Sequence, residues 1–232
     1  RTGATNTTAP PLPLAPHPRA GDHGTDRRAH DQTPRPPHPA DPASGAFTPD
    51  QRRILTALLM PLFLALMSVS VVNVALPAIE SGLDATSADL QWVLAGYTLT
   101  FGTVLVAAGR AGDLWGRKNL FLAGITLYML GSLLSGLAGD TLLLNAGRLL
   151  TGLGAGVFNP QVIGFIQSNF HGRARGRAYG LFGTVVGLGV AVGPLLGGLF
   201  LGAFGPEWGW RSTFLMNVPV GLAAVAMGAL WL

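Results

Sequence analysis

Six long apolar stretches dominate the sequence from residue 54 to its last residue. They cover about residues 54–79, 90–109, 119–139, 141–168, 178–203 and 212–232, and none of them contains an acidic residue. A helix needs about 20 such residues to cross the roughly 30 Å hydrocarbon core of a bilayer. In lipid, backbone polar groups must be satisfied within the segment, which favours helices over strands. We therefore predict an all-α polytopic membrane protein with six spanning helices.

Composition supports a membrane protein and narrows its chemistry. Charged residues make up only 11% of the 232 residues, against about 25% in ordinary globular chains. The sequence contains no Cys, which excludes disulfides, thiolate metal sites and cysteine nucleophiles. An intramembrane protease is disfavoured, because the apolar stretches hold neither a His base nor a cluster of His and acids. We expect no enzyme activity, no metal site and no cofactor.

Residues 1–50 differ in composition from the rest of the chain. They contain 11 of the 17 Pro and four of the five His, without any apolar period. Such a segment cannot bury enough apolar surface to offset its ordering entropy. We therefore predict a disordered tail over residues 1–50 and a membrane domain over 51–232. The tail fits neither a nucleic-acid arm, because Asp is interleaved with its Arg, nor a compact metal site. Its four His residues are His17, His23, His30 and His38.

Basic residues collect in every second connection between the apolar stretches. The connections 110–118 and 171–177 carry six Arg and Lys residues, whereas the other three carry one. The positive-inside rule places such basic loops in the cytoplasm. The N-terminal tail, which is followed by Arg52 and Arg53, then lies on the same side. The bias toward Arg, Gly and Ala suggests a GC-rich bacterial genome, so we expect a bacterial cell membrane.

The first basic connection places an acid among glycines and bases. It runs from Gly109 to Lys118 and includes Asp113, Gly116 and Arg117. Asp113 can face the positive end of a helix dipole or pair with an Arg, and the glycines permit a tight turn. We interpret this segment either as a clasp between two conformations or as an ordinary solvated turn.

Arg148 lies inside the fourth apolar stretch. It is about seven residues from the start of that stretch, and thus roughly 10 Å below the membrane surface. A charge at this depth is costly and is by default a functional candidate that faces the bundle interior. The alternative is an Arg that snorkels back to the interface.

The fifth apolar stretch combines glycines with a proline. Gly189, Gly193 and Gly197 recur at a spacing of four, with Pro194 and Gly198 among them. Glycines at this spacing put a smooth groove on one helix face, where another helix can approach closely. Pro194 removes a backbone hydrogen bond and is expected to bend the helix. A bent helix with a glycine face suits a moving or sealing interface, and plain close packing is the alternative.

Few polar side chains lie in the apolar stretches, and these are the candidates for contact with a substrate. They are Asn73, Gln91, Tyr97, Asn159 and Gln161. Ordinary hydrogen bonding between helices would explain each of them equally well.

Together these motifs resemble the major facilitator superfamily over about residues 52–232. Asp113 with its glycines resembles the loop motif between spans two and three, and Arg148 resembles the span-four motif. Residues 189–198 resemble the antiporter motif of span five. Further similarities to the fourteen-span drug:H⁺ antiporters lie at residues 71–77, 91–97 and 209–221.

The resemblance implies two six-helix halves around a central cavity, each a 3+3 inverted repeat. This chain would be the N-terminal half. The resemblance further implies proton-coupled export of drugs or other lipophilic or cationic compounds, with gating by the 109–118 loop and proton coupling by Arg148. It assigns helix bending and leak prevention to the span-five motif. The expected partners are membrane lipid, protons, a small-molecule substrate and a missing C-terminal half-bundle, but no nucleic acid. The alternative is a self-contained six-span channel or small transporter that acts as a homodimer.

One position departs from the family pattern, which usually has an acid five residues before Asn73. Here that position is Ser68. Because Ser68 and Arg148 lie at nearly the same depth, we expect them to face each other, and we include both as proton-coupling candidates. A hydroxyl does not titrate near neutral pH, so either the proton site lies in the missing half or coupling differs in this protein.

Overall fold

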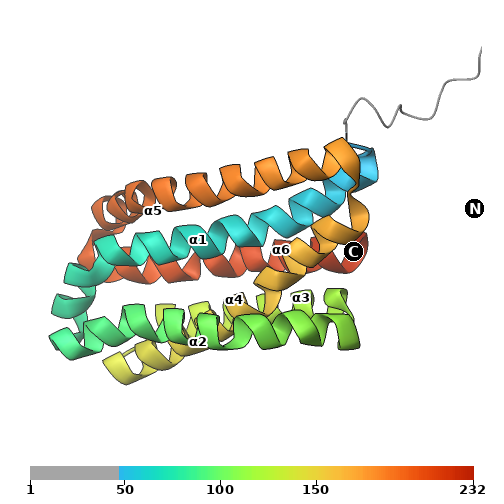
Figure 1. Cartoon of the computed structure of the whole chain (residues 1–232). Coiled ribbons are helices and arrows are strands. Elements are labelled where there is room, and N and C mark those ends of the chain that lie inside the picture. Colours follow the sequence, from blue (N-terminus) through green and yellow to red (C-terminus); the bar gives the residue numbers. More distant parts are fainter. Residues whose placement is uncertain (1–46) are drawn as a thin grey trace, which may run out of the picture. The chain divides into compact units, whose positions relative to one another are not determined.

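The computed structural model describes residues 47–232, so most of the predicted tail and its four His residues lie outside the described part. Six helices are present in this part, and they run side by side along one direction (Figure 1). The helices are α1 (Pro49–Leu83), α2 (Ser87–Trp115), α3 (Arg117–Gly136), α4 (Thr141–Asn169), α5 (Gly172–Leu215) and α6 (Asn217–Trp231).

The two ends of the bundle differ in charge, and we name them by it. The basic end holds the start of α1, the α2–α3 and α4–α5 connections and the end of α6. It bears Arg52, Arg53, Arg110, Arg117, Lys118, Arg173, Arg175 and Arg177. The acidic end holds the α1–α2 and α3–α4 connections and the segment before α6. It bears Glu80, Asp84, Asp89, Asp140 and Glu207.

Three helices begin at side chains that satisfy their first backbone amides. Thr48 and Gln51 form a capping box at the start of α1, and Thr86 and Asp89 form another at the start of α2. The carboxylate of Asp140 caps α4. Such caps satisfy amides that have no partner within the helix. These helix starts are therefore set by short polar residues and not by hydropathy.

The connections are shorter than the hydropathy pattern predicts. The predicted loop 110–118 is helical except at Gly116, and most of the predicted loop 171–177 belongs to α5. Likewise, the predicted connection 80–89 is non-helical only near Asp84–Thr86. The hydrocarbon core accounts for roughly 30 Å of a bilayer that is about 40–45 Å thick with its headgroups. Helices that continue through the headgroup zone carry polar residues, which the apolar pattern does not count.

The largest difference from the predicted elements concerns α5 and α6. The backbone stays helical through Pro194 and departs from helical geometry at Gly205, whose φ of 76° favours glycine. Residues 206–211, predicted as a loop, are helical, and the predicted sixth helix at 212–232 is divided at Met216. Five segments of the described chain are long and apolar enough to cross a membrane when α5 and α6 count as one.

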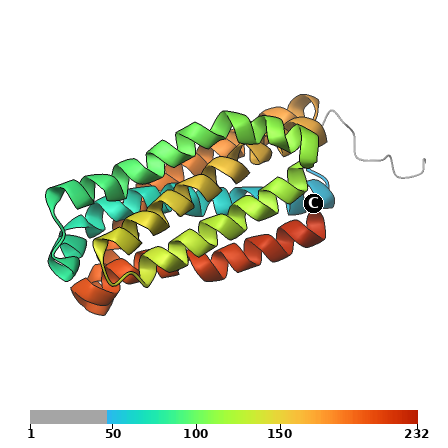
Figure 2. The same ribbon diagram turned by 90° about the horizontal axis from the view of Figure 1, so that it is seen from below.

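The packing partners of the helices reveal an internal repeat. Helix α1 packs on α5 as α4 packs on α2, and α1 packs on α6 as α4 packs on α3. Figure 2 shows α3 between α4 and α6. The contact of α3 with α6 completes the pattern, because the exchange of the two triplets maps this pair onto itself. Exchanging the first three helices for the last three therefore reproduces the packing. Since α1 starts at the basic end and α4 at the acidic end, the repeat is inverted, as in many transporter folds.

The tightest helix contact joins α3 and α4. A Cβ atom at Gly124 would lie 2.6 Å from the backbone nitrogen of Phe158, and one at Gly131 would lie 2.5 Å from that of Thr151. The two backbones therefore touch directly, which only glycine allows, as in other closely packed membrane helices. This contact fixes α4, and with it Arg148, against α3.

Candidate functional site

A cavity of about 360 Å³ lies between α1, α2, α4 and α5. Three of the predicted substrate-contact residues, Asn73, Tyr97 and Asn159, line it, together with Ser70, Thr98 and Phe101. The remaining lining residues are aliphatic. No charged side chain of the described chain belongs to the lining. The cavity therefore offers aromatic and weakly polar contacts to a small molecule.

Arg148 lies against the wall of this cavity. Its Cζ atom is 4.6 Å from the centroid of the Tyr97 ring, and its Nε donates a 2.9 Å hydrogen bond to the carbonyl of Val93. The side chain is 1% exposed and its Nη1 has no hydrogen-bond partner. Within residues 47–232, no carboxylate lies within ion-pair distance of it. The guanidinium is thus a buried cation held by an aromatic ring and a backbone carbonyl.

Ser68 belongs to a different polar cluster. The side-chain nitrogen of Asn217 donates to the hydroxyls of Ser68 and Ser132, both at 3.3 Å. The hydroxyl of Tyr128 adjoins the same two serines. These contacts join α1, α3 and α6, whereas Arg148 turns toward α2. In the described chain no hydrogen bond connects Ser68 with Arg148, so the structure does not bring the expected pair together.

Gln91 and Gln161 lie away from the cavity. Gln91 borders an open hollow near the acidic end of α2. Gln161 is buried between α2 and α4, where its Nε2 donates a 2.8 Å hydrogen bond to the carbonyl of Ala108. Gly112 provides the room, because a Cβ there would overlap the Gln161 amide. Gln161 thus links two helices in this structure and does not reach the cavity.

The acid of the 109–118 segment pairs with a base across the turn between α2 and α3. Nη2 of Arg117 lies 2.8 Å from Oδ1 of Asp113, and Gly116 between them has a φ of 90° that favours glycine. The Arg117 guanidinium also packs on α4, where a Cβ at Gly164 would lie 2.7 Å from its Cζ. Such a half-exposed pair contributes little stability by itself. Its geometry nevertheless fastens the turn to α4.

Helix α3 is fastened at both ends, to α6 at the basic end and to the last turns of α5 at the acidic end. At the basic end, Nζ of Lys118 donates a 2.8 Å hydrogen bond to the carbonyl of Ala229 in the last turn of α6. At the acidic end, Arg211 donates to the carbonyls of Gly136 and Ala138, at 3.3 and 2.6 Å, where α3 ends. The last carbonyls of a helix lack partners within it, and cations complement the dipole there.

The glycines of the span-five motif face α1. A Cβ at Gly189, Gly193 or Gly197 would meet α1 within 3.2 Å. Ser70 of α1 is close enough to donate a 2.8 Å hydrogen bond to the carbonyl of Val190. The motif therefore brings α5 against the helix that forms one wall of the cavity.

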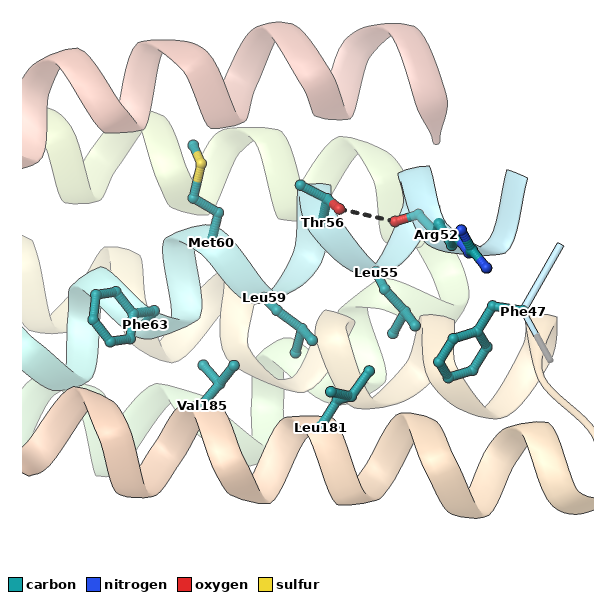
Figure 3. Close-up of a pocket in the computed structure, with 9 residues that line it drawn as sticks. All are labelled: Phe47, Arg52, Leu55, Thr56, Leu59, Met60, Phe63, Leu181 and Val185. Atoms are coloured by element: carbon teal, nitrogen blue, oxygen red, sulfur yellow. Dashed lines mark hydrogen bonds between the residues drawn. The ribbon is translucent and has the colours of Figure 1, made fainter. Parts of the chain in front are cut away.

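Toward the basic end, α1 and α5 separate and leave an apolar groove of about 520 Å³ (Figure 3). Leu181 and Val185 lie eight and four residues before Gly189, so larger side chains here take the positions of the glycines. They point toward Leu55 and Leu59 of α1 across the groove. The change from glycine to branched side chains along one face of α5 explains why the two helices part.

The sequence motifs assign no role to Phe214 and Trp210, two aromatic residues near Arg148. The ring centroid of Phe214 lies 5.8 Å from its Cζ, and Trp210 packs edge-on against Phe214 at 6.3 Å. Both are fully buried. Together with Asn217 they recur at i, i+4 and i+7, a single helical face. This helical spacing begins within the predicted loop 206–211, and it is the sequence feature that could have indicated a helix with a buried aromatic face here.

Comparison with known proteins yields a consistent set of relatives. The pattern that defines the Major Facilitator Superfamily matches residues 58–232. The probable actinorhodin transporter of Streptomyces coelicolor is 34% identical over 227 residues, which are 97% of this chain and 36% of that protein. The puromycin resistance protein of Streptomyces alboniger is 38% identical over 180 residues, 76% of this chain and 35% of that protein. The chain thus spans about a third of the length of these curated relatives.

Solved structures share the helix arrangement. A bacterial homologue of the human lysosomal transporter Spinster, inward-facing and occupied, matches with a TM-score of 0.64 at 20% identity. The match covers 80% of this chain and 44% of that one. The unoccupied form gives a TM-score of 0.63 at 21% identity, over 80% of this chain and 43% of that one. At this identity the likeness shows the fold alone.

Proposed function

The chain belongs to the Major Facilitator Superfamily, whose members are membrane transporters and not enzymes, and we propose that it is the N-terminal half of an exporter of antibiotic-like small molecules. Support comes from relatives that are named for actinorhodin transport and puromycin resistance. The observation that carries the proposal is the uncharged, partly aromatic cavity between α1, α2, α4 and α5. A site of this kind suits a lipophilic organic molecule.

We propose that a second half-bundle completes the cavity. The relatives are much longer than this chain, which favours two fused halves over a homodimer of six-span chains. The basic end would face the cytoplasm of a bacterial cell, because Arg and Lys collect there. The start of α1 lies at that end, and membrane lipid would surround the bundle.

We further propose that export is coupled to proton entry. In the described chain the acids lie near the helix ends, so the titrating carboxylate would belong to the second half. Arg148 would act on that carboxylate as a buried cation, since a positive charge in a low-dielectric site favours ionisation of a nearby acid. The Asp113–Arg117 pair would serve as the gate at the cytoplasmic end.

The test is efflux by the complete reading frame expressed in a drug-sensitive bacterium. We expect a raised inhibitory concentration for at least one antibiotic in a panel, and loss of that protection when a protonophore collapses the gradient. Arg148→Gln should abolish most of the protection, whereas Arg53→Gln, at the exposed start of α1, is the matched control. Protection that survives the protonophore would contradict proton coupling. A protein that protects against no compound would contradict export.

A further inference from the structure

The cavity wall and Arg148 together indicate which charge a substrate carries. We propose that this half of the transporter accepts planar, hydroxylated aromatic compounds that are neutral or anionic, and that it disfavours cations. The inference rests on the proposed export function and narrows it. It departs from the lipophilic or cationic substrates that the sequence motifs imply.

The first argument is the shape of the aromatic wall. The rings of Tyr97 and Phe101 both line the cavity, with centroids 6.1 Å apart and planes within 9° of parallel. The two parallel rings, on adjacent turns of α2, present aromatic surface to the cavity. Aromatic groups pack favourably on such surfaces in an offset, stacked arrangement. The wall therefore suits a planar ring system.

The second argument is the direction of the hydrogen bonds at the wall. The hydroxyl of Ser70 donates to the carbonyl of Val190 at 2.8 Å, and that of Thr98 donates to the carbonyl of Leu94 at 3.1 Å. The amide nitrogen of Asn73 likewise donates to a carbonyl of its own helix, at 3.2 Å. The hydroxyl oxygens of Ser70 and Thr98 and the amide oxygen of Asn73 can therefore act as acceptors toward the cavity, although one N–H of Asn73 stays available. A ligand hydroxyl, such as a phenol, can donate to them.

The third argument is the sign of the electrostatic potential. Arg148 lies on the far side of the Tyr97 ring, fully buried, without a carboxylate within ion-pair distance in the described chain. An uncompensated charge in a low-dielectric site acts strongly over several ångströms. Whenever the carboxylate proposed for the second half is protonated, this charge repels a cation in the cavity and stabilises a phenolate. The Tyr97 face that would otherwise attract a cation already holds the guanidinium.

The test compares two dyes with the same xanthene ring system and opposite charge. Fluorescein is a hydroxylated anion near neutral pH, and rhodamine 6G is a cation. Their binding to the purified complete protein is measured by fluorescence anisotropy in lipid nanodiscs. We expect fluorescein to bind at least about tenfold more tightly. Equal binding, tighter binding of rhodamine 6G, or binding of neither dye would overturn the proposal.

A matched pair of variants locates the effect in the cavity. Thr98→Asp places a carboxylate in the wall and should shift the ratio of the two affinities by about tenfold or more toward rhodamine 6G. Thr98→Asn has nearly the same shape without the charge and should keep fluorescein as the tighter ligand. An unchanged ratio in Thr98→Asp would place the dyes elsewhere and contradict the proposal.

Efflux of the same dyes from cells separates this inference from the proposed function. Tight fluorescein binding without any efflux would contradict export and leave the charge preference standing. Efflux of rhodamine 6G in preference to fluorescein would contradict the charge preference and leave export standing.

Discussion

The α3–α4 contact and the α1–α5 contact both rest on glycines, but they are built differently. In the first, glycines lie on both helices, and an added Cβ would meet backbone atoms of the partner. In the second, the glycines lie on α5 alone, and an added Cβ at Gly193 or Gly197 would first meet side chains of α1. An added Cβ would also come closer than 3.0 Å to the partner helix at all four glycines of the first contact (Gly124, Gly131, Gly147 and Gly154), but only at Gly193 in the second. The α3–α4 contact is therefore rigid, whereas the α1–α5 contact can shift.

The surroundings of the two contacts strengthen this difference. Helix α3 is also tied at both ends, to α6 through Lys118 and to the last turns of α5 through Arg211. Along α5, by contrast, Gly187, Gly198 and Gly202 have no atom within 4 Å of an added Cβ in the described chain. The α3–α4 contact is suited to hold the half-bundle together, and the α1–α5 contact is suited to change during transport.

The largest effect is expected for Gly154→Ala in the α3–α4 contact. The new methyl group would lie 2.7 Å from the carbonyl oxygen of Gly124 and 2.8 Å from the Cα of Tyr128. Overpacking of this kind costs about 3 kcal/mol or more when the backbone cannot yield. Thermal unfolding followed by size-exclusion chromatography should show loss of the folded protein. A variant with wild-type stability would show that this contact is not rigid.

A smaller effect is expected for Gly193→Ala in the α1–α5 contact. The added methyl group would lie 2.5 Å from the Cβ of Ser70, and α5 can move away because its other face is open. We expect a loss of about 1–2 kcal/mol and a larger proportional loss of efflux than of folded protein. Both quantities are measured on the same preparation. Destabilisation as severe as that of Gly154→Ala would remove the distinction between the two contacts.

Loss of the hydrogen bond between Lys118 and α6 is expected to lower stability less than either glycine substitution. Lys118→Gln removes the charged donor to the Ala229 carbonyl, which should cost about 0.5–1 kcal/mol. The measurement is the unfolding temperature, with Lys118→Arg as the control that keeps the charge. If Lys118→Gln alone unfolded the protein, the glycine contact would not be the main restraint on α3.

The smallest effect is expected for Gly198→Ala, one residue beyond Gly197. Nothing in the described chain lies within 4 Å of the added methyl group, so stability should be unchanged or slightly raised, since Ala is the better helix former. Unfolding temperature and efflux are compared with those of Gly193→Ala. Unchanged stability with lost efflux would indicate that the second half packs on this face of α5.

The prediction of an all-α membrane fold from the apolar stretches is confirmed, because length and hydropathy are properties of each segment alone. The glycine spacing also identified the face of α5 that meets α1. The pairing of Ser68 with Arg148 did not follow, because equal depth does not say which neighbour a helix face meets. For the same reason, the sequence does not show that Gln161 lies between α2 and α4 and away from the cavity. The segment 206–211 is predicted as a loop because it separates two apolar stretches and carries Glu207 and Arg211, although its backbone is helical.

The attachment of α3 to the end of α5 through Arg211 and to α6 through Lys118 has a consequence for how the protein is made. Chains are synthesised from the N-terminus and their domains begin to fold in that order, so α3 is in place before residues 211–229 emerge. Until then, Lys118 and the carbonyls of Gly136 and Ala138 lack the partners that the finished bundle gives them. Unsatisfied polar groups in or near lipid are costly. Insertion of the last turns of α5 and of α6 is therefore the step that satisfies these groups and seals the half-bundle.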